Sequence, residues 1–124
     1  MQVKYDFSGK NVILIGGTTG IGRATALAFA GAGANLYVSG LGADLGKGLK
    51  EDVKPFGVEI EFEEVDVRDG KAMKALHENA FARFGRIDIA FNNAGVPGKT
   101  APVHELEDAD YDLLMDVNLR GIFN

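Results

Sequence analysis

The sequence contains no cysteine in its 124 residues, which excludes disulfides and thiolate metal sites. Its two histidines, His77 and His104, stand alone, so no metal site is expected. No apolar run approaches the length of a membrane span, and the N-terminus lacks the apolar core of a signal peptide. Basic residues form no cluster and the net charge is −5, which makes nucleic acid and acidic membranes poor partners. We therefore expect a cytoplasmic enzyme or binding module.

Apolar residues make up 46% of the chain and charged residues 25%, a balance typical of a globular domain with a hydrophobic core. No repeat, low-complexity segment or shift in composition marks a second domain. Residues 1–124 are therefore interpreted as a single domain.

The apolar pattern alternates between the periods of strands and helices. Four strands are expected at 11–15, 34–39, 58–66 and 86–92. Helices are expected from Gly20 to about Gly31, over 43–53, from Asp69 to about Phe84, and from Glu107 to the last residue. Strands that alternate with helices indicate a parallel, right-handed βαβ arrangement.

Two of these segments carry further information. In the first helix, an apolar stripe is predicted to face the core; its members are Ile21, Ala24, Leu27, Ala28 and Ala32. In the third strand, apolar residues alternate with Glu59, Glu61 and Glu63, which gives one apolar and one acidic face. That pattern favours an edge strand, where charges discourage unwanted pairing.

The stretch GGTTGIG, residues 16–22, places four glycines in the turn between the first strand and the first helix. Glycine loses more conformational entropy on folding than other residues, so such a cluster needs a local reason. Bare backbone N–H groups at a helix N-terminus form an anion site, and a bound phosphate is one such reason. The other possible reason is a tight turn with close packing of the helix. The loop ends in Gly22-Arg23-Ala24, which does not match a Walker-type phosphate loop.

The spacing Gly16-x-x-x-Gly20-Ile21-Gly22 resembles the glycine loop of the short-chain dehydrogenase/reductase family. Three further stretches support the resemblance: Asp66-Val67 at the end of the third strand, NNAG at 92–95, and MDVNLRGIF at 115–123. They occur in the family's order and at suitable separations, from about Phe7 to the last residue.

The resemblance implies a Rossmann-like α/β fold: a doubly wound parallel sheet of order 3-2-1-4, with helices on both faces. The ligand crevice is then expected between strands 1 and 4, where the order reverses. It also implies an NAD(P)-dependent oxidoreductase that transfers hydride between nicotinamide and a small-molecule alcohol or carbonyl substrate, in a homo-oligomer.

The resemblance also assigns roles residue by residue. The glycines would line the pyrophosphate, Asp66 and Val67 would contact adenine, and 92–95 would pass beside the ribose and the middle of NAD or NADP. The implied cofactor-binding residues are Gly16, Thr18, Thr19, Gly20, Ile21, Gly22, Gly40, Leu41, Asp66, Val67, Asn92, Ala94 and Gly95. Asn118 matches the catalytic asparagine that anchors a water in a proton relay. It stands among apolar neighbours, where a buried amide needs partners.

Several of these residues also have a simpler, non-functional interpretation. Asp66 could be a solvated carboxylate at a strand end, and Asn92 and Asn93 could be turn formers. Ile15 stands where most relatives have threonine, whose hydroxyl ties the first strand to NNAG; apolar packing would have to replace that bond.

The family's catalytic serine and Tyr-x-x-x-Lys pair lie beyond the asparagine and have no match in these 124 residues. The chain is therefore interpreted as the N-terminal portion of a longer reductase, inactive alone. The alternative is a non-catalytic dinucleotide-binding module. Gly40 and Leu41 stand where relatives place an acid for NAD or an arginine for NADP, so these residues leave the choice between the two cofactors open.

Overall fold

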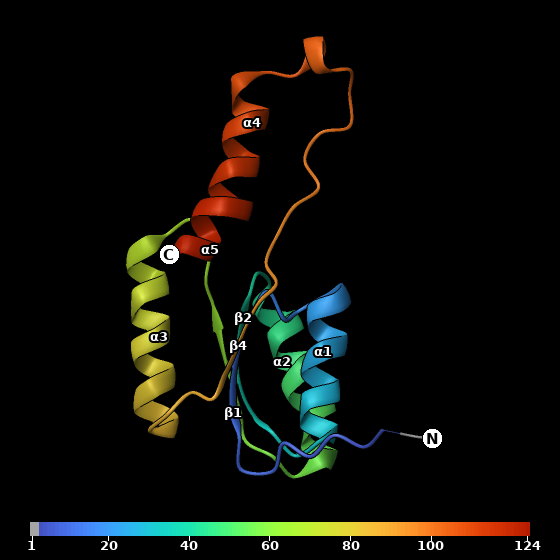
Figure 1. Ribbon diagram of the computed structural model, residues 1–124, viewed down its shortest axis with the longest axis vertical. Coiled ribbons are helices and arrows are strands. Elements are labelled where there is room, and N and C mark those ends of the chain that lie inside the picture. The colour runs from blue at the N-terminus through green and yellow to red at the C-terminus, as the bar shows by residue number, and fades with distance from the viewer. Residues whose placement is uncertain (1–2) are drawn as a thin grey trace.

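The computed structural model describes residues 3–124 and contains one four-stranded parallel sheet of order β3-β2-β1-β4. The strands are β1 (Asn11–Ile15), β2 (Asn35–Gly40), β3 (Ile60–Glu64) and β4 (Ile89–Asn92). Helices α1 (Gly20–Gly31) and α2 (Ala43–Val53) cover one face, and α3 (Gly70–Phe84) covers the other (Figure 1). The predicted fold class and strand order are confirmed.

The outer strands are shorter than predicted, because each pairs with its neighbour over only part of the predicted segment. β3 pairs with β2 from Ile60 to Glu64, and β4 pairs with β1 from Ile89 to Asn92. Beyond these ranges, single backbone hydrogen bonds still join Glu59, Val65 and Asp88 to the neighbouring strands. A short 3-10 helix, η1 (Lys54–Phe56), follows α2.

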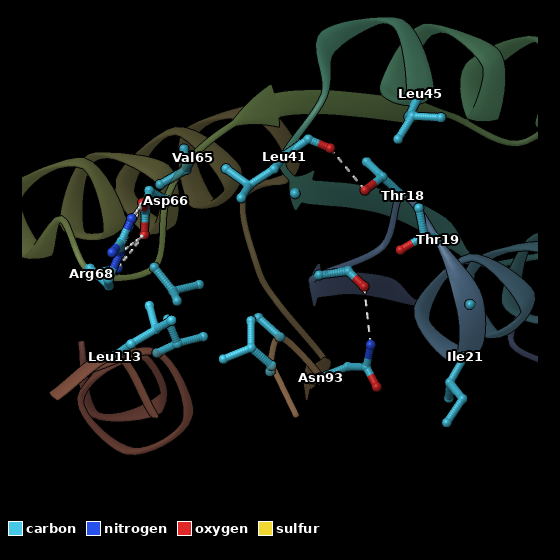
Figure 2. Close-up of a pocket in the computed structure, with 18 residues that line it drawn as sticks. Thr18, Thr19, Ile21, Leu41, Leu45, Val65, Asp66, Arg68, Asn93 and Leu113 are labelled. Carbon is cyan, nitrogen blue, oxygen red and sulfur yellow. Dashed lines mark hydrogen bonds and ion pairs between the residues drawn. The ribbon is translucent and has the colours of Figure 1, made fainter. Parts of the chain in front are cut away.

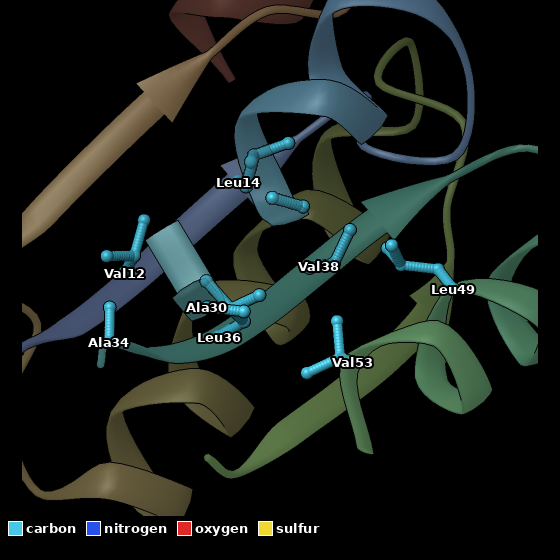
Figure 3. Packing of buried hydrophobic residues seen from close by; sticks show 9 residues of the cluster. Val12, Leu14, Ala30, Ala34, Leu36, Val38, Leu49 and Val53 are labelled. Atoms are coloured by element: carbon cyan, nitrogen blue, oxygen red, sulfur yellow. The ribbon is translucent and has the colours of Figure 1, made fainter. Parts of the chain in front are cut away.

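The two faces of the central strands bury separate clusters. Every residue of β1 is buried, as expected of a strand covered on both sides. Even-numbered residues of β1 and β2 pack under α1 and α2; this cluster contains Val12, Leu14, Ala26, Ala30, Ala34, Leu36, Val38, Leu49 and Val53 (Figure 3). Odd-numbered residues pack under α3 with Met73, Leu76 and Ala80. Burial on both sides fixes the position of the loop that leaves β1.

The face that α1 buries differs from the predicted stripe. Its buried residues are Gly22, Ala26 and Ala30, whereas the side chain of Ile21 is 74% exposed. Of the predicted stripe, Leu27 is partly buried and packs against the core. The prediction is wrong for Ile21, Ala24 and Ala28, which are exposed, because small residues occupy the part of the helix that lies closest to the sheet. In an alanine-rich helix, several faces are equally apolar in sequence.

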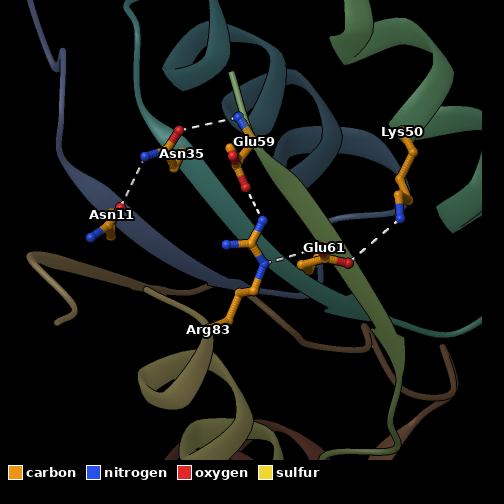
Figure 4. A network of polar contacts seen from close by, with 6 residues as sticks. All are labelled: Asn11, Asn35, Lys50, Glu59, Glu61 and Arg83. Carbon is orange, nitrogen blue, oxygen red and sulfur yellow. Dashed lines mark hydrogen bonds and ion pairs between the residues drawn. The ribbon is translucent and has the colours of Figure 1, made fainter. Parts of the chain in front are cut away.

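The acidic face of β3 contacts α3. Arg83 of α3 forms ion pairs with Glu59 and Glu61, the second of these at 3.3 Å between Nε and Oε1 (Figure 4). Lys50 of α2 reaches Glu61 from the other side, with 3.6 Å between Nζ and Oε2. β3 is an edge strand as predicted, and its glutamates in addition attach a helix to the sheet.

After β4 the chain runs away from the sheet and returns through a helix that extends beyond it (Figure 1). This segment contains η2 (Val103–Glu105), α4 (Asp108–Met115), the π-helical turn η3 (Asp116–Arg120) and α5 (Gly121–Phe123). The helix starts one residue after the predicted Glu107, which caps it. Within residues 3–124, no helix has both the length and the apolar character to cross a membrane.

Candidate functional site

A cleft of about 650 Å³ lies at the carboxyl ends of the four strands. The loops after all four strands and the inner side of α4 line it (Figure 2); the lining residues are Gly16, Thr18, Thr19, Gly20, Ile21, Gly40, Leu41, Leu45, Val65, Asp66, Val67, Arg68, Asn93, Ala94, Gly95, Val96, Leu113 and Val117. In a doubly wound sheet, this is the edge at which ligands bind. Of the 13 predicted cofactor-binding residues, all but Gly22 and Asn92 line the cleft.

The glycine loop presents bare backbone at the N-terminus of α1. The N-cap residue, Thr19, makes no side-chain cap, and the first turn carries no acidic residue. Gly20 has a left-handed φ of 53°, and a Cβ there would meet nothing within 4 Å. The free N–H groups of this helix end therefore face the cleft without a side chain between them, an arrangement suited to an anion.

The base of the loop is tightly packed. The N–H groups of Gly16 and Gly17 both donate to the carbonyl oxygen of Ser39 at 2.9 Å, which ties the loop to β2. A Cβ on Gly22 would lie 1.9 Å from the carbonyl oxygen of Gly16 and 2.7 Å from Nδ2 of Asn93. Gly22 is therefore a packing residue beneath the loop, and it lies outside the cleft that it was predicted to line.

Asn93 joins the β4 loop to the glycine loop. Its Nδ2 donates to the carbonyl oxygen of Gly16 at 3.0 Å, and its backbone N–H donates to that of Ile15 at 3.0 Å. These bonds connect the end of β1 to the NNAG stretch, the connection for which the sequence offered no hydroxyl at position 15. The Ile15 side chain packs in the core beneath, 1% exposed. The sequence predicted Asn93 only as a turn former, and its place in the NNAG stretch is the signal that could have found this contact. The predicted Asn92 pairs with Ile15 in the sheet and lies outside the cleft lining.

At the end of β2, Thr18 of the glycine loop lies against Gly40. Its hydroxyl donates to the carbonyl oxygen of Leu41 at 3.1 Å (Figure 2). Thr18 and Gly40 are both buried, whereas Leu41 is exposed at the mouth of the cleft. Leu45 of α2 lines the same end and was not predicted.

At the end of β3, Asp66 and Arg68 form a closed pair. The guanidinium donates to both carboxylate oxygens, with 2.6 Å between Nη2 and Oδ2, and the Arg68 backbone N–H donates to Oδ1 at 3.0 Å. These bonds hold the pKa of Asp66 below its usual value, so the carboxyl is ionised at neutral pH. Asp66 and Arg68 are the two formally charged residues of the cleft lining, and Arg68 was not predicted.

Asn118 lies in the π-helical turn η3 and contacts the β4 loop. Its Oδ1 accepts from the Val96 N–H at 2.8 Å, and its Nδ2 donates to the Val96 carbonyl at 2.9 Å. The prediction that this residue is buried is wrong, since Asn118 is exposed. Its amide nevertheless has both partners, because the backbone of Val96 offers a matched donor and acceptor. A Cβ added at the neighbouring Gly95 would lie 3.2 Å from Oδ1 of Asn118.

No group of three or more His, Asp or Glu side chains within residues 3–124 could hold a metal ion. The tyrosines in this part of the chain also lie outside the cleft lining. Tyr37 is buried and donates its hydroxyl to Glu63, and burial together with that contact raises the pKa of Tyr37. The hydroxyl of Tyr37 therefore stays protonated near neutral pH.

Comparisons with known proteins agree with this geometry. The family model described as short chain dehydrogenase matches residues 10–124. A 3beta-hydroxysteroid dehydrogenase of Mediterraneibacter gnavus is 36% identical over 117 residues, which are 94% of this chain and 42% of that protein. A levodione reductase of Leifsonia aquatica is 38% identical over 120 residues, 94% of this chain and 45% of that protein.

Among solved structures, an NAD+-bound xylitol dehydrogenase superposes with a TM-score of 0.91 at 31% identity, covering 94% of this chain and 45% of that one. The chain thus spans less than half the length of the relatives it matches. Fold, motif order and family model agree, and the chain belongs to the short chain dehydrogenase family.

Proposed function

We propose that the protein is an NAD(P)-dependent oxidoreductase that interconverts a small-molecule alcohol and its carbonyl product. The observation that carries the proposal is the cleft, in which an uncapped helix N-terminus with bare glycine backbone lies on the same rim as an ionised carboxylate. This pairing suits the pyrophosphate and adenine of a dinucleotide. Bound NAD(P) would supply the hydride acceptor or donor.

The roles of the residues follow from their places in the cleft. The N–H groups at Gly20 and Ile21 would hold the pyrophosphate, which gains about 0.3–1 kcal/mol from the helix dipole alone. Asp66 would accept from the adenine amino group, and Val67 would lie against the ring. Ala94 and Gly95 would pass along the middle of the cofactor.

Asn118 is proposed to support proton transfer. Because both side-chain atoms bond to Val96, a water would be held by other atoms of the π-helical turn, which the side chain keeps in place. A π-helical turn disturbs the regular backbone ladder, and such turns often occur at functional sites. Asn118 is thus proposed as a positioning residue.

We further propose that the active protein contains a second segment after Asn124, which supplies the acid–base tyrosine and lysine. Two observations support this. The chain covers 42% of the hydroxysteroid dehydrogenase it matches, and β4 has one bonded neighbour in the sheet. A non-catalytic dinucleotide-binding module is the alternative, and the intact mass of the native protein separates the two.

Binding of NADH and NADPH by calorimetry tests the proposed function, with a matched pair of variants at Gly20. Asparagine and aspartate both tolerate the left-handed backbone at this position, where there is room for a side chain. Gly20→Asp places a carboxylate beside the phosphate site and should weaken binding at least about tenfold relative to Gly20→Asn. Equal affinities for the two variants would contradict the anion site.

A further inference from the structure

Position 40 is glycine because of Thr18 and not because of its own backbone. Its φ lies outside the left-handed region, so any residue could adopt the conformation. A Cβ on Gly40, however, would lie 2.8 Å from Cγ2 and 2.9 Å from Oγ1 of Thr18. Thr18 is itself fixed, since it is 6% exposed and its hydroxyl donates to the carbonyl oxygen of Leu41. The threonine side chain therefore takes the volume that a side chain at position 40 would need.

No charged residue lines the cleft beside Gly40, and Asp44, in the first turn of α2, lies outside the lining. In doubly wound folds, an acid at the end of the second strand bonds the ribose 2′-hydroxyl, and an arginine nearby accommodates a 2′-phosphate. Here Leu41 and Leu45 line the rim beside Gly40. The charged residues of the cleft lining, Asp66 and Arg68, neutralise one another.

We propose that Thr18 is the specificity-determining residue of this site: it closes position 40 to an acidic side chain, so that the protein binds NADH and NADPH with similar affinity. This inference rests on the proposed function. It concerns a steric contact between the glycine loop and the last residue of β2, 22 residues further along the chain. It assigns the lack of selectivity between the two cofactors to a residue outside the second strand.

The test is the affinity of the full-length protein for NADH and for NADPH, measured by calorimetry in a set of variants. The wild-type dissociation constants should agree within about threefold, because no charged hydrogen bond distinguishes the two ligands. Thr18→Ala removes Oγ1 and Cγ2, the two nearest atoms, and leaves Cβ of residue 18 at 3.3 Å. The double variant Thr18→Ala/Gly40→Asp should then favour NADH over NADPH at least about tenfold, through a charged hydrogen bond to one and repulsion of the other.

Matched controls separate charge from volume. Thr18→Ala/Gly40→Ala has the same room without the carboxylate and should show no preference. Thr18→Val keeps the volume without the hydroxyl and should keep the wild-type ratio. Gly40→Asp alone should weaken the binding of both NADH and NADPH. If this variant does not fold, the comparison of the two double variants still tests the proposal.

The failures are distinguishable. If the wild type binds neither dinucleotide, the proposed function is overturned, and this inference with it. If it binds one of them at least about tenfold better than the other, or if the Asp and Ala double variants behave alike, the inference alone is overturned. Full affinity and an NADH preference in Gly40→Asp alone would show that Thr18 does not close the position.

Discussion

The two loops that frame the cleft are held in different ways. The glycine loop leaves β1, a strand buried on both faces and paired on both edges, and it is bonded to β2 and to Asn93. The β4 loop leaves a strand with one bonded neighbour and alternately exposed residues, and the helix that follows has no buried residue in α4. One side of the cleft is thus fixed by a fully buried strand, and the other by polar contacts and by the packing of Ala94, Val96 and Val117 at the edge of the second core cluster.

Because of this difference, we expect the two sides of the cleft to contribute differently to cofactor binding and to catalysis. Regions with few buried apolar contacts open locally at a lower free energy than core strands. We expect the glycine-loop side, here called the rigid side, to hold the parts that NAD and NADP share. We expect the conformation of the β4-loop side, here called the open side, to depend on the segment or partner that covers β4 and α4. The exposed apolar residues there are Leu106, Tyr111, Leu113, Leu119, Ile122 and Phe123.

The largest effect on dinucleotide binding is expected from a substitution in the glycine loop. Gly22→Val would drive a side chain into the carbonyl of Gly16 and the amide of Asn93, which are fixed by bonds of their own. Dinucleotide binding should be abolished in calorimetry. Gly48→Ala serves as the control, because a Cβ on this exposed residue of α2 would meet nothing within 4 Å, and it should retain binding. If Gly22→Val binds normally, the glycine loop is not the cradle.

The second prediction concerns the contact between the open loop and the π-helical turn. Asn118→Ala removes both bonds to Val96. Turnover of the full-length protein should fall by about 10²–10⁴-fold, the usual contribution of positioned proton transfer. The dissociation constant of the dinucleotide should stay nearly unchanged, because Asn118 does not line the cleft.

The same variant loses two hydrogen bonds, so its free energy of unfolding should also fall, by about 1–3 kcal/mol. Asn118→Asp keeps the acceptor for the Val96 N–H but sets a carboxylate oxygen against the Val96 carbonyl oxygen, so it should lower the free energy of unfolding at least as much as Asn118→Ala. Normal turnover with a lowered melting temperature would make Asn118 structural and remove it from the proposed chemistry.

Truncating one core side chain on β1 and one on β4 tests the difference between these two strands. Leu14 of β1 is fully buried, and Leu14→Ala should lower the free energy of unfolding by about 2–5 kcal/mol. Phe91 of β4 is partly buried, so Phe91→Ala should cost less than half of that in the 124-residue chain. Denaturant titration measures both. If Phe91→Ala becomes as costly in the full-length protein, the added segment covers β4.

The strand order and the position of the cleft could be predicted because the glycines and the strand ends carry the family resemblance that implies them. The contact between Thr18 and Gly40 was not predicted, because it joins the glycine loop to the end of β2 and exists only in the folded sheet. The buried face of α1 was also missed, since closeness to the sheet selects Gly22 and Ala26 over the larger Ile21. Contacts of Arg83 with the acidic strand depend in the same way on tertiary packing.

The smallest effect is a dependence on pH at the adenine end. Arg68 lowers the pKa of Asp66 from its ordinary value of 3.8, so the pair stabilises the folded chain above that pH. The contribution is lost as the pH falls through the lowered pKa of the folded state. Arg68→Gln should make the drop in melting temperature between about pH 5 and pH 2.5 slightly shallower, because a partly exposed pair contributes little. An unchanged drop would show that the pair does not stabilise the fold.

The bond between Asn93 and Gly16 spans 77 residues, and it has a consequence for the order of folding. β1 can pair with β2 early, after one helical crossover, but its other edge and its glycine loop wait for a strand made much later. Long-range parallel pairing is slow, since the intervening chain must close before the contact forms. We therefore expect the first motif of the chain to be among the last to reach its final geometry. During synthesis the loop would be bonded to β2 but would lack its contacts with Asn93 until β4 has left the ribosome.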